Sequence, residues 1–237
     1  MQQESTFDVY AGADGCPAGW VVVSAAPDGA RLALQEVRVE RDFAALLEST
    51  AGCAALAVDI PIGLSEDGRR EADYAARARI GMRRSSVFPA PPRFALDVPD
   101  YATANALSRS RFGRGLQKQT YNILPKIREA DGCLTPALQQ RVVESHPEVS
   151  FWALAGTAPL AHAKRTEAGR ALRLRLLETA FGPAARDLKP PRGAAWDDLY
   201  DACVLAWTAS RVVDGTAVHL PSRPQRDARG LRMEIVY

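Results

Sequence analysis

The order of the predicted strands in the first 60 residues restricts the fold more than any other feature of this sequence. Residues 7–13, 20–26 and 31–40 are predicted strands, because they are apolar or alternate apolar with polar residues and are separated by turn residues. A helical segment at 41–49 and a buried apolar strand at 54–60 follow. A helical crossover returns the chain in the same direction, so the fourth strand is expected beside the first and parallel to it. The sequence therefore predicts an α/β fold with a mixed sheet.

Two aspartates stand where the first and fourth predicted strands end. Asp14 lies between the first strand and the turn in GADGCPAGW, and Asp59 interrupts the apolar run AALAVDIPIGL. The C-terminal ends of parallel neighbours meet at one sheet edge, so we expect the two carboxylates to lie side by side. Asp14 alone is also typical of a turn residue that accepts backbone hydrogen bonds, and Asp59 can cap the following turn. A carboxylate in an apolar segment otherwise needs a proton or a cation, because its desolvation costs on the order of several kcal/mol.

A third group of acidic residues lies on the helix predicted at 196–213. Asp198 and Asp201 are three residues apart, and Asp197 and Asp201 are four apart, so each pair shares a helix face. Like charges at these spacings destabilise a helix by ~0.2–0.5 kcal/mol unless a cation lies between them. Asp197 and Asp198 also suit the helix N-terminus through its dipole. Asp201 lies one turn deeper and is less easily explained in this way.

A further acid and a histidine occur in the segment VVESHPEVSF. Glu144 and His146 are two residues apart and share one face of the strand predicted at 141–145. A single histidine in this context is more often structural than functional, and Glu148 can simply cap the helix that follows. Oxygen ligands from separate segments suit Mg²⁺ or Mn²⁺, and the lack of a second nearby histidine or cysteine argues against zinc.

Arginine is concentrated between residues 69 and 93, at Arg69, Arg70, Arg77, Arg79, Arg83, Arg84 and Arg93. A solvated helix with internal ion pairs explains part of this concentration. Arg83 and Arg84 precede two serines, an aromatic residue and prolines, which favours a loop that contacts phosphate. Lys126 and Lys164 are isolated candidates. The net charge of +2 does not suggest a histone-like binder, so any contact with nucleic acid would have to come from a local basic patch.

The sequence as a whole predicts a single domain, residues 1–237, with a helical insert at roughly 66–140. No apolar run approaches the ~20 residues needed to span a bilayer, and the N-terminus lacks the layout of a signal peptide. The four widely spaced cysteines are typical of free thiols in a reducing compartment. We therefore expect a cytoplasmic protein without a membrane partner, and nothing in the sequence indicates its oligomeric state.

Several sequence blocks in a fixed order cover nearly the whole chain: GADGCPAGW at 12–20, VDIPIGL at 58–64, R-x-x-D-x-x-x-R at 70–77, SSVFPAP at 85–91, QTYNILPKIREAD at 119–131, ESHPEVSF at 144–151 and DDLYDACVLAWTA at 197–209. With these blocks the chain resembles the DUF429 family of predicted RNase H-like nucleases. The resemblance implies three antiparallel strands followed by parallel strands, with helices on both faces of the sheet. It also implies that the acids of the site come from the first strand, the fourth strand and the last helix.

The leading hypothesis is therefore a nuclease that hydrolyses phosphodiester bonds of DNA or RNA with Mg²⁺ or Mn²⁺. Its expected catalytic residues are Asp14, Asp59, Glu144, Asp198 and Asp201, of which Asp14, Asp59, Asp198 and Asp201 would bind the metal. Its expected substrate contacts are Arg83, Arg84, Lys126 and His146. A non-catalytic binding module on the same fold is the first alternative. An actin-like ATPase or phosphotransferase is the second, although the sequence lacks the duplicated core and the second Gly-rich phosphate hairpin expected of that class.

Overall fold

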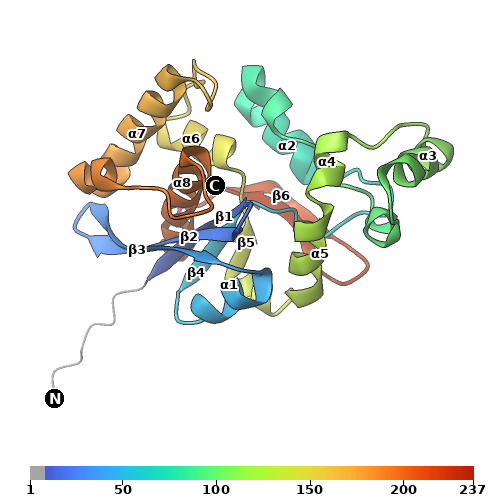
Figure 1. Ribbon diagram of the computed structural model, residues 1–237, viewed down its shortest axis with the longest axis horizontal. Coiled ribbons are helices and arrows are strands. Elements are labelled where there is room, and N and C mark those ends of the chain that lie inside the picture. Colours follow the sequence, from blue (N-terminus) through green and yellow to red (C-terminus); the bar gives the residue numbers. More distant parts are fainter. Residues whose placement is uncertain (1–8) are drawn as a thin grey trace.

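A mixed five-stranded sheet forms the centre of the computed structural model, which describes residues 9–237 (Figure 1). The meander consists of β1 (Tyr10–Cys16), β2 (Gly19–Asp28) and β3 (Arg31–Glu40). Helix α1 (Phe43–Ser49) then leads to β4 (Ala55–Val58), which pairs with β1 in parallel. This arrangement confirms the predicted fold class and the position of the fourth strand. The predicted first strand begins at residue 7, which lies outside the described residues. The N-terminal segment that is predicted to lack a signal peptide also lies outside them.

The fifth strand extends the parallel half of the sheet. It is β5 (Val142–Glu144), and it pairs in parallel with β4, which gives the strand order β3-β2-β1-β4-β5. Three consecutive strands, β1, β4 and β5, therefore run in the same direction. Their C-terminal ends lie at one edge of the sheet, and the chain leaves that edge after residues 16, 58 and 144.

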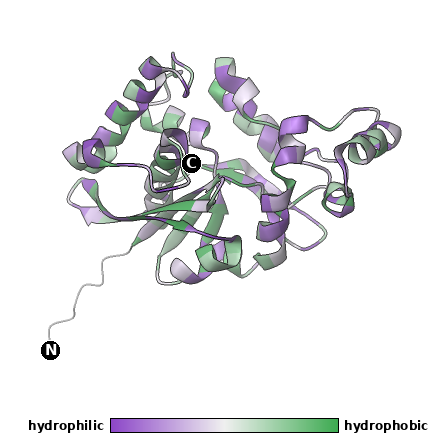
Figure 2. Ribbon diagram, in the orientation of Figure 1, coloured by the Kyte–Doolittle hydropathy of each residue, from purple (hydrophilic) through white to green (hydrophobic). Residues whose placement is uncertain are grey.

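Both faces of the sheet are covered by helices, because apolar side chains alternate along its strands. Val21 and Val23 lie in the cluster formed with α8 (Trp196–Val213), and Trp20 and Val22 lie in the opposite cluster. The α8 side also includes α6 (Pro147–Leu154), α7 (Glu167–Phe181) and the 3-10 helix η4 (Gly182–Asp187). The opposite side includes α1 and α5 (Leu124–Cys133). Figure 2 shows the strands of the sheet mostly green, with purple residues gathered on the helices around them.

Helix α8 lies directly against β1, and Gly12 makes this contact possible. A Cβ atom at position 12 would lie 2.1 Å from the backbone nitrogen of Ala206 and 2.2 Å from the backbone oxygen of Ala202. Any residue other than glycine would therefore force the strand and the helix apart. The close approach places the N-terminal half of α8 beside the C-terminal end of β1.

The chain between β4 and β5 is mostly helical, and α3 lies farthest from the sheet (Figure 1). Its elements are α2 (Glu71–Ile80), η1 (Gly81–Ser86), η2 (Arg93–Asp97), α3 (Tyr101–Phe112), α4 (Lys118–Asn122), α5 and η3 (Leu138–Gln140). We call this segment the insert. A two-stranded hairpin, β6 (His219–Arg226) and β7 (Arg232–Val236), ends the chain and contacts α2. The description as one domain with an insert at 66–140 stays a prediction.

Membrane-spanning helices and the state of the cysteines are two further features that the sequence analysis considered. No helix within residues 9–237 combines the length and the apolarity that a membrane crossing requires. The four cysteines are free thiols, and Cys16, Cys53 and Cys203 are buried.

Candidate functional site

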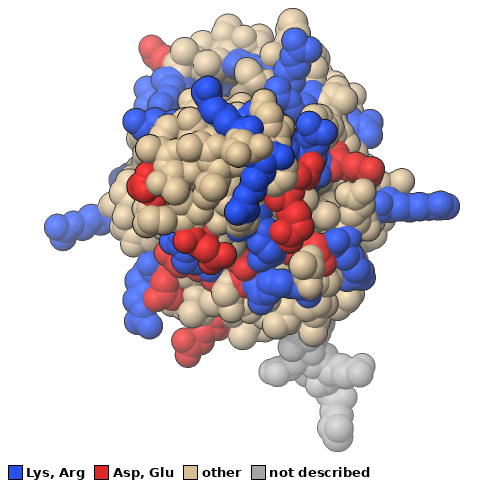
Figure 3. Space-filling view, turned by 90° about the vertical axis from the view of Figure 1, so that its right-hand side faces the viewer, with Lys and Arg blue, Asp and Glu red and all other residues tan. Residues whose placement is uncertain are grey.

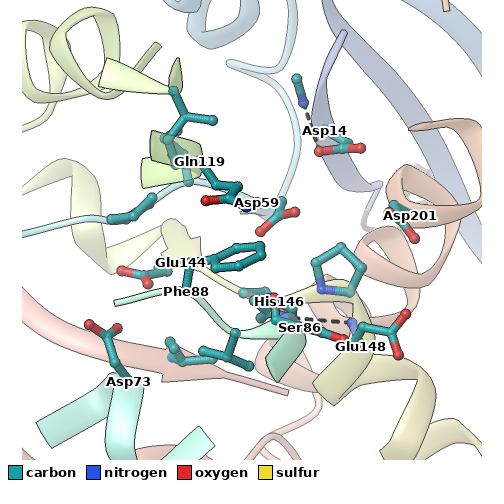
Figure 4. A pocket seen from close by; sticks show the side chains of 18 of the residues that line it. Asp14, Asp59, Asp73, Ser86, Phe88, Gln119, Glu144, His146, Glu148 and Asp201 are labelled. Carbon is teal, nitrogen blue, oxygen red and sulfur yellow. Dashed lines mark hydrogen bonds between the residues drawn. The ribbon is translucent and has the colours of Figure 1, made fainter. Parts of the chain in front are cut away.

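A cavity of about 630 Å³ lies at the sheet edge where β1, β4 and β5 end (Figure 4). Carboxylates from six separate segments line it: Asp14 in β1, Asp59 after β4, Asp73 in α2, Glu144 in β5, Glu148 in α6 and Asp201 in α8. The insert forms one wall, and the segment between α6 and α7 contributes Lys164. Strand order thus gathers residues that are distant in the sequence.

Asp14 and Asp59 are neighbours because of the parallel pairing of β1 and β4. Ala13 is paired with Val58, and the backbone nitrogen of Asp59 donates to the carbonyl oxygen of Ala13 at 3.0 Å. Asp14 accepts a hydrogen bond from the backbone nitrogen of Gly15 at 2.8 Å, which is the turn interaction expected of an aspartate at this position. Burial raises the pKa of both carboxyls, and the charge of Asp59 raises the pKa of Asp14 further. The structure therefore brings together the two aspartates that the strand order paired.

Helix α8 contributes Asp201 to the cavity, whereas Asp198 caps the N-terminus of this helix. The Asp201 side chain is 1% exposed, and its Oδ1 atom is buried without a hydrogen-bond partner. Burial raises the pKa of Asp201 to about 6, although Lys164 acts in the opposite direction. Asp198 does not line the cavity, and its Oδ2 accepts from the backbone nitrogen of Ala195 at 2.8 Å. Of the two α8 aspartates expected to be catalytic, Asp201 lines the cavity with the other acids and Asp198 does not.

Glu148 is an acid of the cavity that the sequence analysis assigned only to helix capping. One of its carboxylate oxygens accepts from Arg173, and the other, Oε2, is buried without a partner. Its charge raises the pKa of Asp59 and of Asp201, in each case after the larger effect of burial. The strand-end argument reaches Glu148 only once β5 is known to lie beside β4, because the residues that follow β5 then reach the same edge as Asp14 and Asp59.

Glu144 lines the same cavity, but hydrogen bonds occupy both of its carboxylate oxygens. Arg70 donates to Oε1 at 2.5 Å and to Oε2 at 2.9 Å, and the backbone nitrogen of Ile62 donates to Oε2 at 2.6 Å. The same guanidinium group donates to Asp73 at 2.6 Å. Glu144 thereby holds the segment that follows Asp59 against β5. These contacts favour a positioning role for Glu144, and the catalytic role expected from the sequence stays a prediction.

The three basic residues expected to contact substrate differ in where they lie. Arg83 lines the cavity and donates through Nε to the carbonyl oxygen of Leu160 at 3.0 Å. Lys126 also lines it, with its Nζ 2.7 Å from the carbonyl oxygen of Gly19. Arg84 is exposed and does not line the cavity. Two of the three therefore line the cavity, and each donates to a backbone carbonyl oxygen.

His146 lies at the start of α6 and joins the acids to the insert. Its Nδ1 accepts from the backbone nitrogen of Glu148 at 3.2 Å, and its Nε2 lies 3.3 Å from the carbonyl oxygen of Ser86. The neutral imidazole with its proton on Nε2 satisfies both contacts. His146 thus caps α6 and fixes the position of Glu148 at the cavity.

Lys164 is the basic residue that contacts Asp201 in the cavity. Its Nζ is 2.6 Å from Oδ2 of Asp201 and 3.9 Å from a carboxylate oxygen of Asp197. Burial alone would lower the pKa of Lys164, but the charge and hydrogen bond of Asp201, together with the charges of Asp14 and Asp59, raise it. One ammonium group therefore offsets part of the negative charge that the fold collects here.

The donor set suits a cation that prefers oxygen, but its present arrangement does not enclose one. Two buried carboxylate oxygens lack partners, on Glu148 and Asp201, and both residues line the cavity with Asp14 and Asp59. Within residues 9–237, no three or more His, Cys, Asp or Glu side chains are placed to hold a metal ion. Side chains would have to move, Lys164 among them, before an ion could be shared.

Comparisons with known proteins give one match. The family described as "Protein of unknown function (DUF429)" matches residues 12–226, which is most of the chain. No curated protein and no solved structure matches this sequence.

Proposed function

This chain belongs to the DUF429 family, and we propose that it is a metal-dependent nuclease that hydrolyses phosphodiester bonds. The observation that carries the proposal is the convergence of Asp14, Asp59, Glu148 and Asp201 on one cavity, with a buried oxygen of Glu148 and one of Asp201 left without a partner. A folded protein keeps buried carboxylates in such numbers only where protons or cations compensate them. The family itself carries no assigned activity, so the site alone supports the proposal.

The four carboxylates would hold Mg²⁺ or Mn²⁺, since both ions prefer oxygen ligands. When bound, such an ion supplies a water of lowered pKa and stabilises the charge that develops on the phosphate. The unpartnered oxygens of Glu148 and Asp201 are the first that we assign to it. Asp14 and Asp59 complete the set because their pKa values are raised by burial, so a positive charge nearby would stabilise their ionised forms.

The residues of this chain would perform the other tasks of the reaction. Arg83 and Lys126 line the cavity and would bind the phosphate oxygens of the substrate. His146 would keep Glu148 in position through its contact with the backbone of that residue. Pro61 and Pro147 contribute apolar wall, which limits the water around the carboxylates.

The proposal is tested by cleavage and by metal binding in the same variants. Labelled DNA and RNA oligonucleotides are incubated with the purified chain in MnCl2, in MgCl2 and in EDTA, and Mn²⁺ binding is measured by calorimetry. We expect metal-dependent cleavage that Asp59→Asn abolishes, with weaker Mn²⁺ binding in that variant. Asp187→Asn is the matched control, because Asp187 is exposed and lies outside the cavity. Cleavage in EDTA, or an Asp59→Asn variant as active as the wild type, would overturn the mechanism.

The contact between Lys164 and Asp201 favours a second candidate, a non-catalytic binding module. In that case the ammonium group would be the permanent counter-ion of Asp201, and the cavity would bind a ligand without a metal. Calorimetry that detects no Mn²⁺ binding, together with no cleavage of any nucleic acid, would support this candidate. The actin-like alternative gains no support, because residues 9–237 contain one five-stranded sheet and one hairpin, whereas that class has a duplicated core.

A further inference from the structure

The wall of the cavity that the insert forms carries apolar side chains that remain exposed. Phe88 is 45% exposed and Ile123 is 40% exposed, and both line the cavity with the acids. Figure 4 shows the Phe88 ring projecting into the cavity on the side of Asp59. Exposed aromatic rings are unfavourable in water, so an aromatic ring beside a polar site is a candidate contact for a flat, apolar ligand surface.

The backbone on both sides of Phe88 is fixed, although the ring is exposed. Arg77 donates to the carbonyl oxygen of Val87 at 2.8 Å, and Thr120 donates to the carbonyl oxygen of Pro89 at 3.1 Å. The side chain of Val87 is buried in the core that α2 forms with α6 and the final hairpin. The ring is therefore presented by an anchored segment, which reduces the entropy lost when a ligand stacks on it.

Polar groups surround the ring on the other walls. Gln119 in α4 lines the cavity and offers an amide that can both donate and accept (Figure 4). Arg83, Lys126 and Lys164 place positive charge around the acids. One cavity thus combines an aromatic surface, an amide and cations, which match the base, the base edge and the phosphate of a nucleotide.

The depth of the acids limits the form of nucleic acid that can reach them. The side chain of Asp201 is 1% exposed and Asp14 as a residue is 8% exposed, so both lie at the floor of the cavity. The volume of about 630 Å³ is in the range of roughly 300–1,000 Å³ typical of small-molecule sites. A base within a duplex is paired and stacked between its neighbours, so it cannot enter a cavity of this size and stack on Phe88. An unpaired nucleotide can.

The charge pattern on the surface seen from the insert side bears on whether a duplex would bind there. In Figure 3 aspartate and glutamate lie among lysine and arginine over the middle and lower part of this face, and the upper part carries mostly basic side chains with uncharged surface between them. Duplex binding depends on many phosphate contacts made along an extended basic surface. The charge pattern of this face therefore fits recognition of a short unpaired segment better than recognition of a duplex.

We propose that the cavity binds an unpaired nucleotide whose base stacks on Phe88, so that the substrate is single-stranded nucleic acid. The inference rests on the proposed function, because it assigns the substrate class of the same site. Phe88 is a substrate-binding residue here, and Gln119 faces the edge of the base. DNA and RNA share the base and the phosphate, and the experiment separates them.

The test measures binding without cleavage. Fluorescence anisotropy is recorded in EDTA with a 12-nucleotide single-stranded DNA, the same sequence in RNA, and the blunt DNA duplex. Stacking of one base is worth a factor of roughly 5 to 150 in affinity, so Phe88→Ala should weaken single-strand binding within that range. Phe88→Trp keeps an aromatic surface and should bind within about threefold of the wild type.

Two controls separate this inference from the nuclease proposal. Met82→Ala removes an apolar side chain that is 83% exposed and lies outside the cavity, so its binding should match the wild type. Equal binding by Phe88→Ala and the wild type, or a duplex bound as tightly as the single strand, overturns the inference even if metal-dependent cleavage is found. A selective loss in Phe88→Ala supports it even if no cleavage is detected, since no metal is present in the assay.

Discussion

Replacing Arg70 with methionine should destabilise this protein severely, because its buried guanidinium group is the cation that two buried carboxylates share. The Arg70 side chain is 1% exposed, and it donates to Asp73, to both oxygens of Glu144 and to the carbonyl oxygens of Ile62 and Gly63. The substitution leaves two buried carboxylates without their cation. Methionine fills much of the same volume, so the change isolates the loss of charge and hydrogen bonds.

The expected loss follows from the burial of the network. Removing one partner of a buried ion pair destabilises a protein by about 3–5 kcal/mol, because the remaining charge is left uncompensated. Here the Glu144 and Asp73 side chains are 5% and 4% exposed, so solvent screens neither of them. We therefore expect a loss of about 4 kcal/mol, a large part of the 5–15 kcal/mol typical of whole domains.

Urea unfolding, followed by far-UV circular dichroism at pH 7, measures this loss as a shift of the midpoint at constant slope. The matched control is Arg186→Met, because Arg186 donates twice to Glu178, at 2.8 and 2.7 Å, but its side chain is 66% exposed. That variant should lose less than about 1 kcal/mol. A second variant, Arg70→Met with Glu144→Gln, should recover part of the loss because one of the orphaned charges is gone. The reasoning fails if Arg70→Met is no less stable than Arg186→Met.

Two further predictions concern the cavity and the final hairpin. Lys164→Met should lower stability without metal by about 1–2 kcal/mol, because it removes a charge-assisted hydrogen bond to Asp201 from a side chain that is 36% exposed. It should also bind Mn²⁺ several-fold more tightly in calorimetry, and weaker binding would contradict the competition between the ammonium group and the ion. Burial would raise the pKa of Glu234, but hydrogen bonds from His219 and Arg232 hold this pKa below its usual value of 4.5. The ionised carboxylate therefore stabilises the fold above pH 4.5, and this stabilisation is lost as the pH falls through the pKa of Glu234 in the folded protein. The stability difference between the wild type and Glu234→Gln should accordingly be about 1–2 kcal/mol at pH 7 and shrink below pH 4 in urea titrations, whereas a difference independent of pH would rule out this charge as the cause.

The strand order was predictable because it depends on local patterns. Alternation, β-branched residues and turn signals define the first four strands in the sequence itself, and the helical crossover then dictates a parallel pair. The adjacency of Asp14 and Asp59 follows from this topology without any knowledge of side-chain packing. Both residues lie at the predicted edge, and their register is given by the pairing of β1 with β4.

The partners of the charged residues were not predictable in the same way. Arg70 and Glu144 are 74 positions apart, and nothing local distinguishes this buried arginine from the solvated arginines around it. Lys164 reaches Asp201 only because the segment before α7 folds back over α8. Glu148 was interpreted as a helix cap because an acid in a first helical turn has that local explanation, and only the position of β5 shows that it also faces the cavity.

The contact between Gly12 and α8 determines which parts of the site can adapt. Asp14 and Asp201 are carried by a strand and a helix whose main chains touch, so the span between them is fixed by the backbone. Lys164 and Phe88 sit on connecting segments, where insertions and substitutions are tolerated more readily. Relatives that act on different ligands should therefore diverge along these connecting segments and retain glycine at position 12. A directed-evolution library should likewise vary the segments that carry Lys164 and Phe88.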